Sequence, residues 1–209
     1  MQFAYIKDVR MGALLIAFEV IIVYNDSGEE EKITLLKQSF PFSVGEELTE
    51  EDVDVLKSEG EVFTAVVHGL KLLGYSDQSV RSLALKLMRK GYDKVTAASA
   101  AKAIESLGYI NEAEQIARRA RVHASKLKGQ RLVISELFSD GYGKDAISEW
   151  SESDPTDYGA LCARAIEKKG GMPDSSDVDG KRKLLSYLYR RGFSQSDVRE
   201  AVRILSEKE

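Results

Sequence analysis

The sequence of 209 residues contains few cysteines, which could cross-link the fold, and few prolines, which would interrupt helices. It has one cysteine, three prolines and one tryptophan. A single cysteine, Cys162, excludes an internal disulfide and suits a reducing compartment. With 43% hydrophobic and 31% charged residues, the composition excludes a disordered chain. The length is sufficient for a substantial buried core.

Long apolar runs are also missing. The strongest candidate, Met11 to Tyr24, has 14 residues and is interrupted by Glu19, whereas a membrane-spanning helix needs about 20 apolar residues. It also lacks the basic stretch and small-residue cleavage site of a signal peptide. We therefore expect this run to form part of a buried strand pair in a soluble, cytoplasmic protein that does not contact a membrane.

The common catalytic motifs are absent: there is no His-Glu-x-x-His, no close cysteine pair, no Gly-x-Ser-x-Gly and no Gly-x-Gly-x-x-Gly. Gly69 to Ser76 has the glycine spacing of a phosphate loop, but Tyr75 stands where the lysine belongs. Cys162 lies in a helical pattern where a small buried residue is expected, which argues against a nucleophile paired with His68 or His123. The sequence thus predicts a protein that is not an enzyme and uses no cofactor or metal.

Charge is distributed unevenly along the chain. The net charge is −4, but residues 1–61 hold 5 Lys and Arg against 14 Asp and Glu, whereas residues 62–209 hold 25 against 20. A polyanionic partner should therefore prefer the second part of the chain.

The first 60 residues predict a small sheet followed by a helix. Three segments are rich in Ile, Val, Phe and Tyr, as strands are: Phe3–Arg10, Leu14–Tyr24 and Lys32–Leu36. Residues 25–28 supply a turn between the last two. Thr49 followed by Asp52 is typical of a helix N-terminus, and we expect a helix from about Glu50 to Ser58.

From residue 62 onward the sequence repeats. A glycine followed by an aromatic residue recurs at intervals of 50 and 51 residues, at Gly91-Tyr92, Gly141-Tyr142 and Gly192-Phe193. Equivalent positions before each glycine are apolar: Leu83, Ala84, Leu87 and Met88; Val133, Ile134, Leu137 and Phe138; Leu184, Leu185, Leu188 and Tyr189. Each glycine should end one helix and start a turn into the next, with the aromatic residue filling the corner.

Each helix pair follows another predicted helix. These helices cover Val62–Leu73, Glu112–Leu127 and Thr156–Lys169. Helical apolar spacing follows the first and third glycines, as in Ala97, Ala100, Ala101 and Ile104, whereas the middle copy decays after Ile147 and Trp150. The predicted fold is mainly α, with three tandem three-helix repeats in an elongated, curved array after a small N-terminal β-hairpin or sheet. The expected domains are a strand-rich segment at 1–43, an acidic linker helix at 44–61, and repeats at 62–111, 112–155 and 156–209.

One basic cluster stands out as a candidate binding site. Between residues 118 and 131 there are six cations and no acid: Arg118, Arg119, Arg121, Lys126, Lys128 and Arg131. Helical spacing places Arg118, Arg121 and Ser125 on one face. Further candidates are Lys181, Arg182, Lys183, Arg190 and Arg191, although cations such as Arg190 and Arg191 can also offset a helix dipole. Such a surface would suit an acidic protein groove or a phosphate backbone.

These segments resemble the RecX family. The resemblance covers residues 44–209 and rests on LALKLMRKGY at 83–92 with LGYINE at 107–112, on IARRAR at 116–121 with KGQRLVISEL at 128–137, and on KLLSYLYRRGFS at 183–194. Residues 1–40 match only as a strand-rich lead-in. The resemblance implies three-helix repeats that bind the RecA recombinase filament on DNA, slow its ATP hydrolysis and strand exchange, and favour its disassembly. We expect the basic residues to contact acidic filament residues or nearby DNA phosphates, and the protein to be a monomer.

Two other functions fit the residues. A free-standing nucleic-acid binder could read DNA through helix-turn-helix-like corners and would bind DNA in a salt-sensitive way without RecA. An unrelated helical scaffold with no link to DNA is the third hypothesis.

Overall fold

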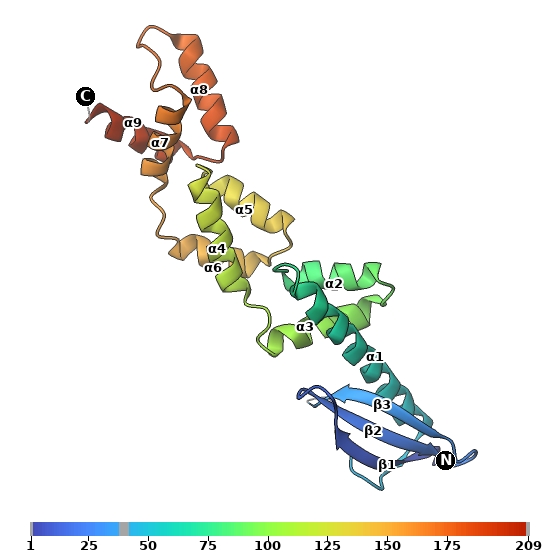
Figure 1. Ribbon diagram of the computed structural model, residues 1–209. Helices are drawn as coiled ribbons and strands as arrows, with labels where there is room; N and C mark the ends of the chain where they lie inside the picture. The colour runs from blue at the N-terminus through green and yellow to red at the C-terminus, as the bar shows by residue number, and fades with distance from the viewer. Residues whose placement is uncertain (1, 38–41, 208–209) are drawn as a thin grey trace. The chain divides into compact units, whose positions relative to one another are not determined.

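The computed structural model describes residues 2–37 and 42–207 (Figure 1). The chain divides into two compact units, Met1–Ile110 and Asn111–Glu209. Within the described ranges there are nine helices and one four-stranded sheet, which confirms the prediction of a helical repeat protein with a small N-terminal sheet. None of the helices in these ranges is both long enough and apolar enough to cross a bilayer.

The sheet is antiparallel, with the order β3-β2-β1-β4. Its strands are β1 (Ala4–Met11), β2 (Ala17–Tyr24), β3 (Glu30–Leu36) and β4 (Glu47–Leu48). The three predicted strands are confirmed, but β2 begins after Leu14 because the carbonyl of Leu14 accepts a hydrogen bond from the amide of Ala17 and closes a turn. The expected turn after Tyr24 is present, and Gly28 within it has a φ of 70°.

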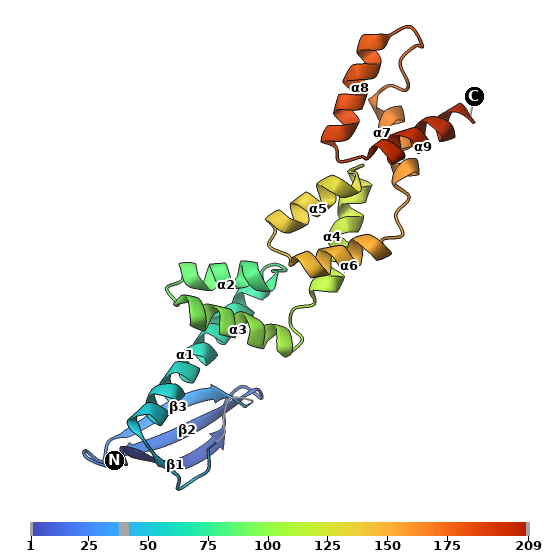
Figure 2. The same ribbon diagram turned by 180° about the vertical axis from the view of Figure 1, so that it is seen from behind.

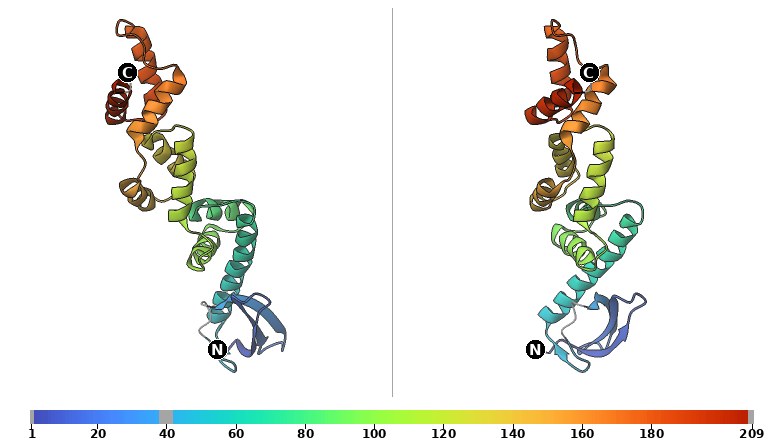
Figure 3. Two further views of the ribbon diagram at one scale, coloured as in Figure 1. Left: turned by 60° about the vertical axis from the view of Figure 1, so that its left-hand side comes forward. Right: turned by 90° about the vertical axis from the view of Figure 1, so that its left-hand side faces the viewer.

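Helix α1 (Glu50–Leu73) joins the sheet to the first repeat. The predicted start is confirmed, because the Thr49 hydroxyl accepts from the amide of Asp52 and the Asp52 carboxylate accepts from the amide of Thr49. The prediction of a helix that ends near Ser58, followed by a separate helix from Val62, is wrong. Figure 3 shows one continuous helix that runs from the sheet into the first repeat.

Gly60 explains why a break was expected and why none occurs. Glycine weakens a helix interior by up to about 1 kcal/mol relative to alanine, so Ser58 to Gly60 has the composition of a helix end. A Cβ atom on Gly60 would lie 2.9 Å from Cγ2 of Ile33 on β3. The missing side chain therefore allows the helix to cross the sheet closely, and packing against the sheet overrides the local propensity.

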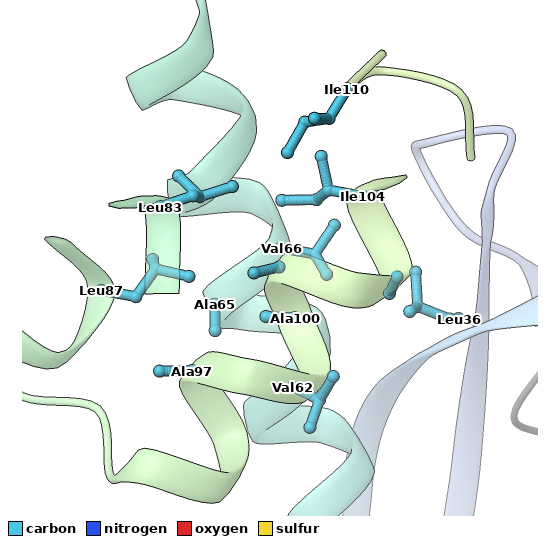
Figure 4. Packing of buried hydrophobic residues seen from close by; sticks show 12 residues of the cluster. Leu36, Val62, Ala65, Val66, Leu83, Leu87, Ala97, Ala100, Ile104 and Ile110 are labelled. Atoms are coloured by element: carbon cyan, nitrogen blue, oxygen red, sulfur yellow. The ribbon is translucent and has the colours of Figure 1, made fainter. Parts of the chain in front are cut away.

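The first repeat is completed by α2 (Val80–Arg89) and α3 (Lys94–Ser106). The second half of α1 packs with both helices around a common core, shown in Figure 4. The predicted apolar face of α3 is confirmed, since Ala97, Ala100, Ala101 and Ile104 are all fully buried.

The second unit contains two further repeats, visible from behind in Figure 2. Their helices are α4 (Glu112–Ser125), α5 (Gln130–Ser139), α6 (Lys144–Ser153), α7 (Tyr158–Lys169), α8 (Val178–Arg190) and α9 (Gln195–Ser206). Each repeat has its own buried cluster. Trp150, with 9% of its surface exposed, belongs to the core of the middle repeat.

The three repeated glycines have the predicted role. Gly91, Gly141 and Gly192 have φ values of 105°, 89° and 87°, a left-handed conformation that glycine adopts at low cost. The aromatic residue that follows fills the corner in the second and third repeats, where Tyr142 and Phe193 are buried. In the first repeat Tyr92 is only partly buried, and its hydroxyl lies 2.6 Å from Nδ1 of His68.

Candidate partner-binding surface

The basic run from Arg118 to Arg131 covers α4, the loop after it and the start of α5. Ile116 and Ala120 on α4 are buried and hold the helix against its own repeat. Arg118, Arg121 and Ser125 lie on the exposed side. The helical register therefore presents part of the basic run to solvent.

Arg119 is paired with residues of the middle repeat. Its guanidinium forms an ion pair with Asp140, with Nη1 2.8 Å from Oδ2, and its Nε donates to the Tyr142 hydroxyl at 3.0 Å. That hydroxyl donates in turn to Gln115. Burial raises the pKa of Tyr142, so the hydroxyl remains a donor at neutral pH. Arg119 thus fixes the turn after α5, and its charge is already paired.

Lys128 is also internally paired. Its Nζ lies 2.6 Å and 2.7 Å from the two carboxylate oxygens of Glu136, and Nδ1 of His123 lies 2.9 Å from the same carboxylate. Burial lowers the pKa of His123, against the opposing effect of Glu136. The segment that reads KGQRLVISEL thereby ties the loop before α5 to the middle of that helix.

The loop between α4 and α5 meets the turn between α8 and α9 through backbone contacts. The amide of Gly129 donates to the carbonyl of Arg191 at 2.7 Å, and the amide of Arg131 donates to the carbonyl of Gly192 at 3.2 Å. The Arg191 guanidinium donates to the carbonyls of Lys126 and Leu127. Arg191 therefore joins the second and third repeats.

A Cβ atom on Gly129 would collide with the backbone of Gly192 and Phe193. Only glycine permits this approach, so the two repeats meet with their main chains in direct contact. We call these contacts the repeat junction. Leu127, just before it, has a φ of 56° and is buried.

Arg118 is exposed but has an interaction of its own within the chain, and the other predicted cations fall into two groups. Lys181 donates to the carbonyl of Ser175, and Arg182 pairs with Asp179 on the surface of α8. Five others are exposed, and their side chains have no hydrogen-bond or ion-pair partner in the part of the chain that the structure describes: Arg121, Lys126, Arg131, Lys183 and Arg190. We call these five residues the unpaired cations.

The structure adds two cations that the sequence analysis missed. A shallow cleft of about 350 Å³ lies between the end of α4 and α7 and is lined by Ser125, Leu127, Arg164, Glu167 and Lys168. Arg164 and Lys168 are exposed and extend the basic surface onto α7. Their one-turn spacing on a predicted helix was the only available signal, because nothing in the sequence brings α7 close to the end of α4.

Cys162 and Gly69, the first residue of the segment with phosphate-loop spacing, lie in helices and belong to the packed core. Cys162 is fully buried in α7, and burial raises the pKa of its thiol to about 12, which leaves almost no thiolate at neutral pH. The segment with phosphate-loop spacing begins inside α1, where Gly69 is buried against Ile104 and Leu83. Among residues 2–37 and 42–207, no group of three or more His, Cys, Asp and Glu could hold a metal ion.

Comparison with known proteins relates the chain to a family. Residues 157–202 match the family model described as RecX, third three-helix domain. The chain is 33% identical to the regulatory protein RecX of Pelodictyon phaeoclathratiforme over 146 residues, covering 68% of this chain and 88% of that protein. It is 30% identical to the regulatory protein RecX of Chlorobaculum tepidum, covering 72% and 94% respectively.

A solved structure agrees on the fold. The crystal structure of a regulatory protein RecX aligns with a TM-score of 0.63 over 93% of this chain and 96% of its own, at 17% identity. At this level of identity the likeness supports the fold alone.

Proposed function

Because the chain belongs to the RecX family of regulatory proteins, we propose that it binds the RecA filament on DNA and restrains the ATP hydrolysis and strand exchange of that filament. It acts by binding, without a cofactor or a chemical step of its own, as a monomer in the cytoplasm. The contacts are with acidic groups of the filament, and DNA phosphates within it are a secondary source of negative charge.

The observation that carries this proposal is the set of unpaired cations. Residues 118–131 contain six Lys and Arg and no Asp or Glu, and three of the six, Arg121, Lys126 and Arg131, are exposed without an internal carboxylate. An ordinary solvated helix face mixes the two signs of charge. A surface of one sign destabilises the folded state slightly through charge repulsion, but it raises the rate and specificity of association with an acidic partner.

The internally paired cations refine the proposed contact set. Arg119, Lys128 and Arg191 have hydrogen-bonded partners within the second unit, so their replacement would disturb the fold together with any binding. The unpaired cations, extended by Arg164 and Lys168, can be changed without removing an internal contact. These residues are therefore the informative positions for mutagenesis.

The test is a double charge reversal, Arg121→Glu with Lys126→Glu, in an assay of single-stranded-DNA-dependent ATP hydrolysis by RecA. A matched control reverses Lys102 on α3 and Lys144 on α6, which are also exposed and produce the same change in net charge. We expect wild type and control to inhibit alike. The test variant should need roughly tenfold or more protein for the same inhibition, since each lost contact at a charged interface costs about 1 kcal/mol or more.

Free-standing DNA binding is the competing function, and the same proteins test it. It predicts steeply salt-dependent binding to DNA in the absence of RecA, and loss of that binding in the variant. Inhibition of RecA that is unchanged by the reversal would remove these residues from the proposed contact. Absence of inhibition by the wild-type protein would refute the proposed function itself.

A further inference from the structure

The second helix of each repeat shares an exposed pattern that the fold does not require. The core is built from two positions per helix, Leu83 and Leu87 on α2, Val133 and Leu137 on α5, and Leu184 and Leu188 on α8, all with 8% or less of their surface exposed. Those positions lie eight and four residues before each repeated glycine. The opposite side of each helix is free to vary.

Two positions on that opposite side are nevertheless repeated. Ten residues before each glycine is an arginine, Arg81, Arg131 and Arg182, and all three are exposed. Three residues before each glycine is a large apolar or aromatic side chain, Met88, Phe138 and Tyr189, with 39%, 46% and 47% of its surface exposed. Residues seven apart lie on one helix face, about 10 Å apart along the axis.

Helix electrostatics do not explain the arginines. Arg81 lies in the first turn of α2 and Arg131 lies in the first turn of α5. Neither first turn contains an acidic residue that would pair with the arginine. The positive end of the helix dipole disfavours a cation there by a few tenths of a kcal/mol or more. Arg182 pairs with Asp179, but both side chains are more than 70% exposed, and such a solvated pair contributes little and can exchange partners.

The apolar positions are unusual for the same reason. One exposed methionine or tyrosine is ordinary on a protein surface. Three at the same place in three repeats, each two turns from an exposed arginine, are not accounted for by packing, because the core positions are occupied by other residues.

We propose that this shared face of α2, α5 and α8, which we call the Arg-apolar face, binds successive identical subunits of the filament. On each subunit Met88, Phe138 or Tyr189 enters an apolar pocket, and Arg81, Arg131 or Arg182 pairs with a carboxylate beside that pocket. The inference rests on the proposed function and specifies its interface. It adds Arg81 and the three apolar residues, none of which belongs to the basic cluster.

The chemistry of the face favours protein over nucleic acid as its occupant. A phosphate backbone is recognised by cations and polar groups and gives no reason to expose large apolar side chains. Base stacking would need a ring at each position, and Met88 has none. An apolar anchor beside an arginine is typical of the centre of a protein interface, and three copies of one face fit a partner made of repeated subunits.

The experiment uses two triple variants of the full chain. The first replaces Met88, Phe138 and Tyr189 by serine, and the second replaces Arg81, Arg131 and Arg182 by glutamate. The control replaces Val55, Val95 and Val202 by serine, because these residues are also exposed apolar side chains but lie on α1, α3 and α9. The measurements are binding to RecA filaments on single-stranded DNA, binding to the same DNA alone, and the thermal unfolding midpoint.

We expect each triple variant to bind the filament about a hundredfold more weakly, since linked contacts multiply, while the control binds like wild type and all proteins unfold at similar temperatures. Wild-type affinity in either triple variant, or an equal loss in the control, would overturn the inference while the proposed function stood. Parallel loss of binding to naked DNA would also overturn it. If the wild-type protein fails to bind the filament, the proposed function fails, and the inference fails with it.

Discussion

Replacing Gly129 by alanine tests the repeat junction. The added Cβ atom would collide with the backbone of Gly192 and Phe193, so the two turns must separate. Separation breaks the hydrogen bond from Gly129 to Arg191 and the one from Arg131 to Gly192. Each such bond contributes about 1 kcal/mol, and the contacts of the Arg191 guanidinium weaken with them. We expect Gly129→Ala to lower the free energy of unfolding by about 2–4 kcal/mol.

Gly143→Ala provides a matched control. Gly143 precedes α6 as Gly129 precedes α5, both have extended backbone with φ of −69° and −76°, and neither makes a side-chain cap. A Cβ atom on Gly143 would meet nothing within 4 Å. The two substitutions therefore share their effects on helix capping and on the unfolded chain, and the difference between them isolates the junction.

The assay is urea-induced unfolding followed by circular dichroism, with amide hydrogen exchange as a local probe. Gly129→Ala should unfold at lower urea than Gly143→Ala, and the amide of Arg131 should lose protection only in the former. Equal destabilisation by the two substitutions would refute the main-chain contact between the second and third repeats.

Three further predictions follow from the internal contacts. Lys128→Met should lower the free energy of unfolding by about 1 kcal/mol, because it leaves the partly buried Glu136 without its cation; unchanged urea unfolding would contradict this. Because burial lowers the pKa of His123 below 6.5, the unfolded chain binds the proton more readily, so stability should be full above pH 6.5 and fall as the pH drops below it. This slope should flatten in His123→Gln, and an identical slope would contradict the assignment. Cys162 should react with a thiol reagent only after denaturant is added, because it is buried and its thiol pKa is about 12; rapid reaction in the native protein would show that α7 is not packed as described.

The repeats could be predicted because the determining signals are local. A glycine with left-handed backbone and a two-turn apolar pattern recur at nearly constant spacing, and both are visible without tertiary information. The Thr49 and Asp52 capping box is predictable for the same reason, since its two partners are three residues apart. The continuity of α1 could not be predicted, because it depends on contact between Gly60 and Ile33, which are distant in sequence.

The sequence predicts where the basic residues of the candidate site cluster, but not which of their side chains are free to contact a partner. The sequence shows that residues 118–131 are basic. It does not show that Lys128 faces Glu136, eight residues away, or that Arg191 reaches the carbonyls of Lys126 and Leu127 across the junction. Those pairings depend on how helices pack and on how two turns meet, and they separate the cations that hold the fold from those that face solvent.

The most direct test of the proposed function is co-sedimentation of the wild-type protein with RecA filaments assembled on single-stranded DNA, compared with the same DNA alone. We predict saturable binding to the filament, little binding to bare DNA at physiological salt, and a fall in ATP turnover that follows occupancy. Equal binding to DNA with and without RecA, with ATP turnover unchanged at saturation, would contradict it.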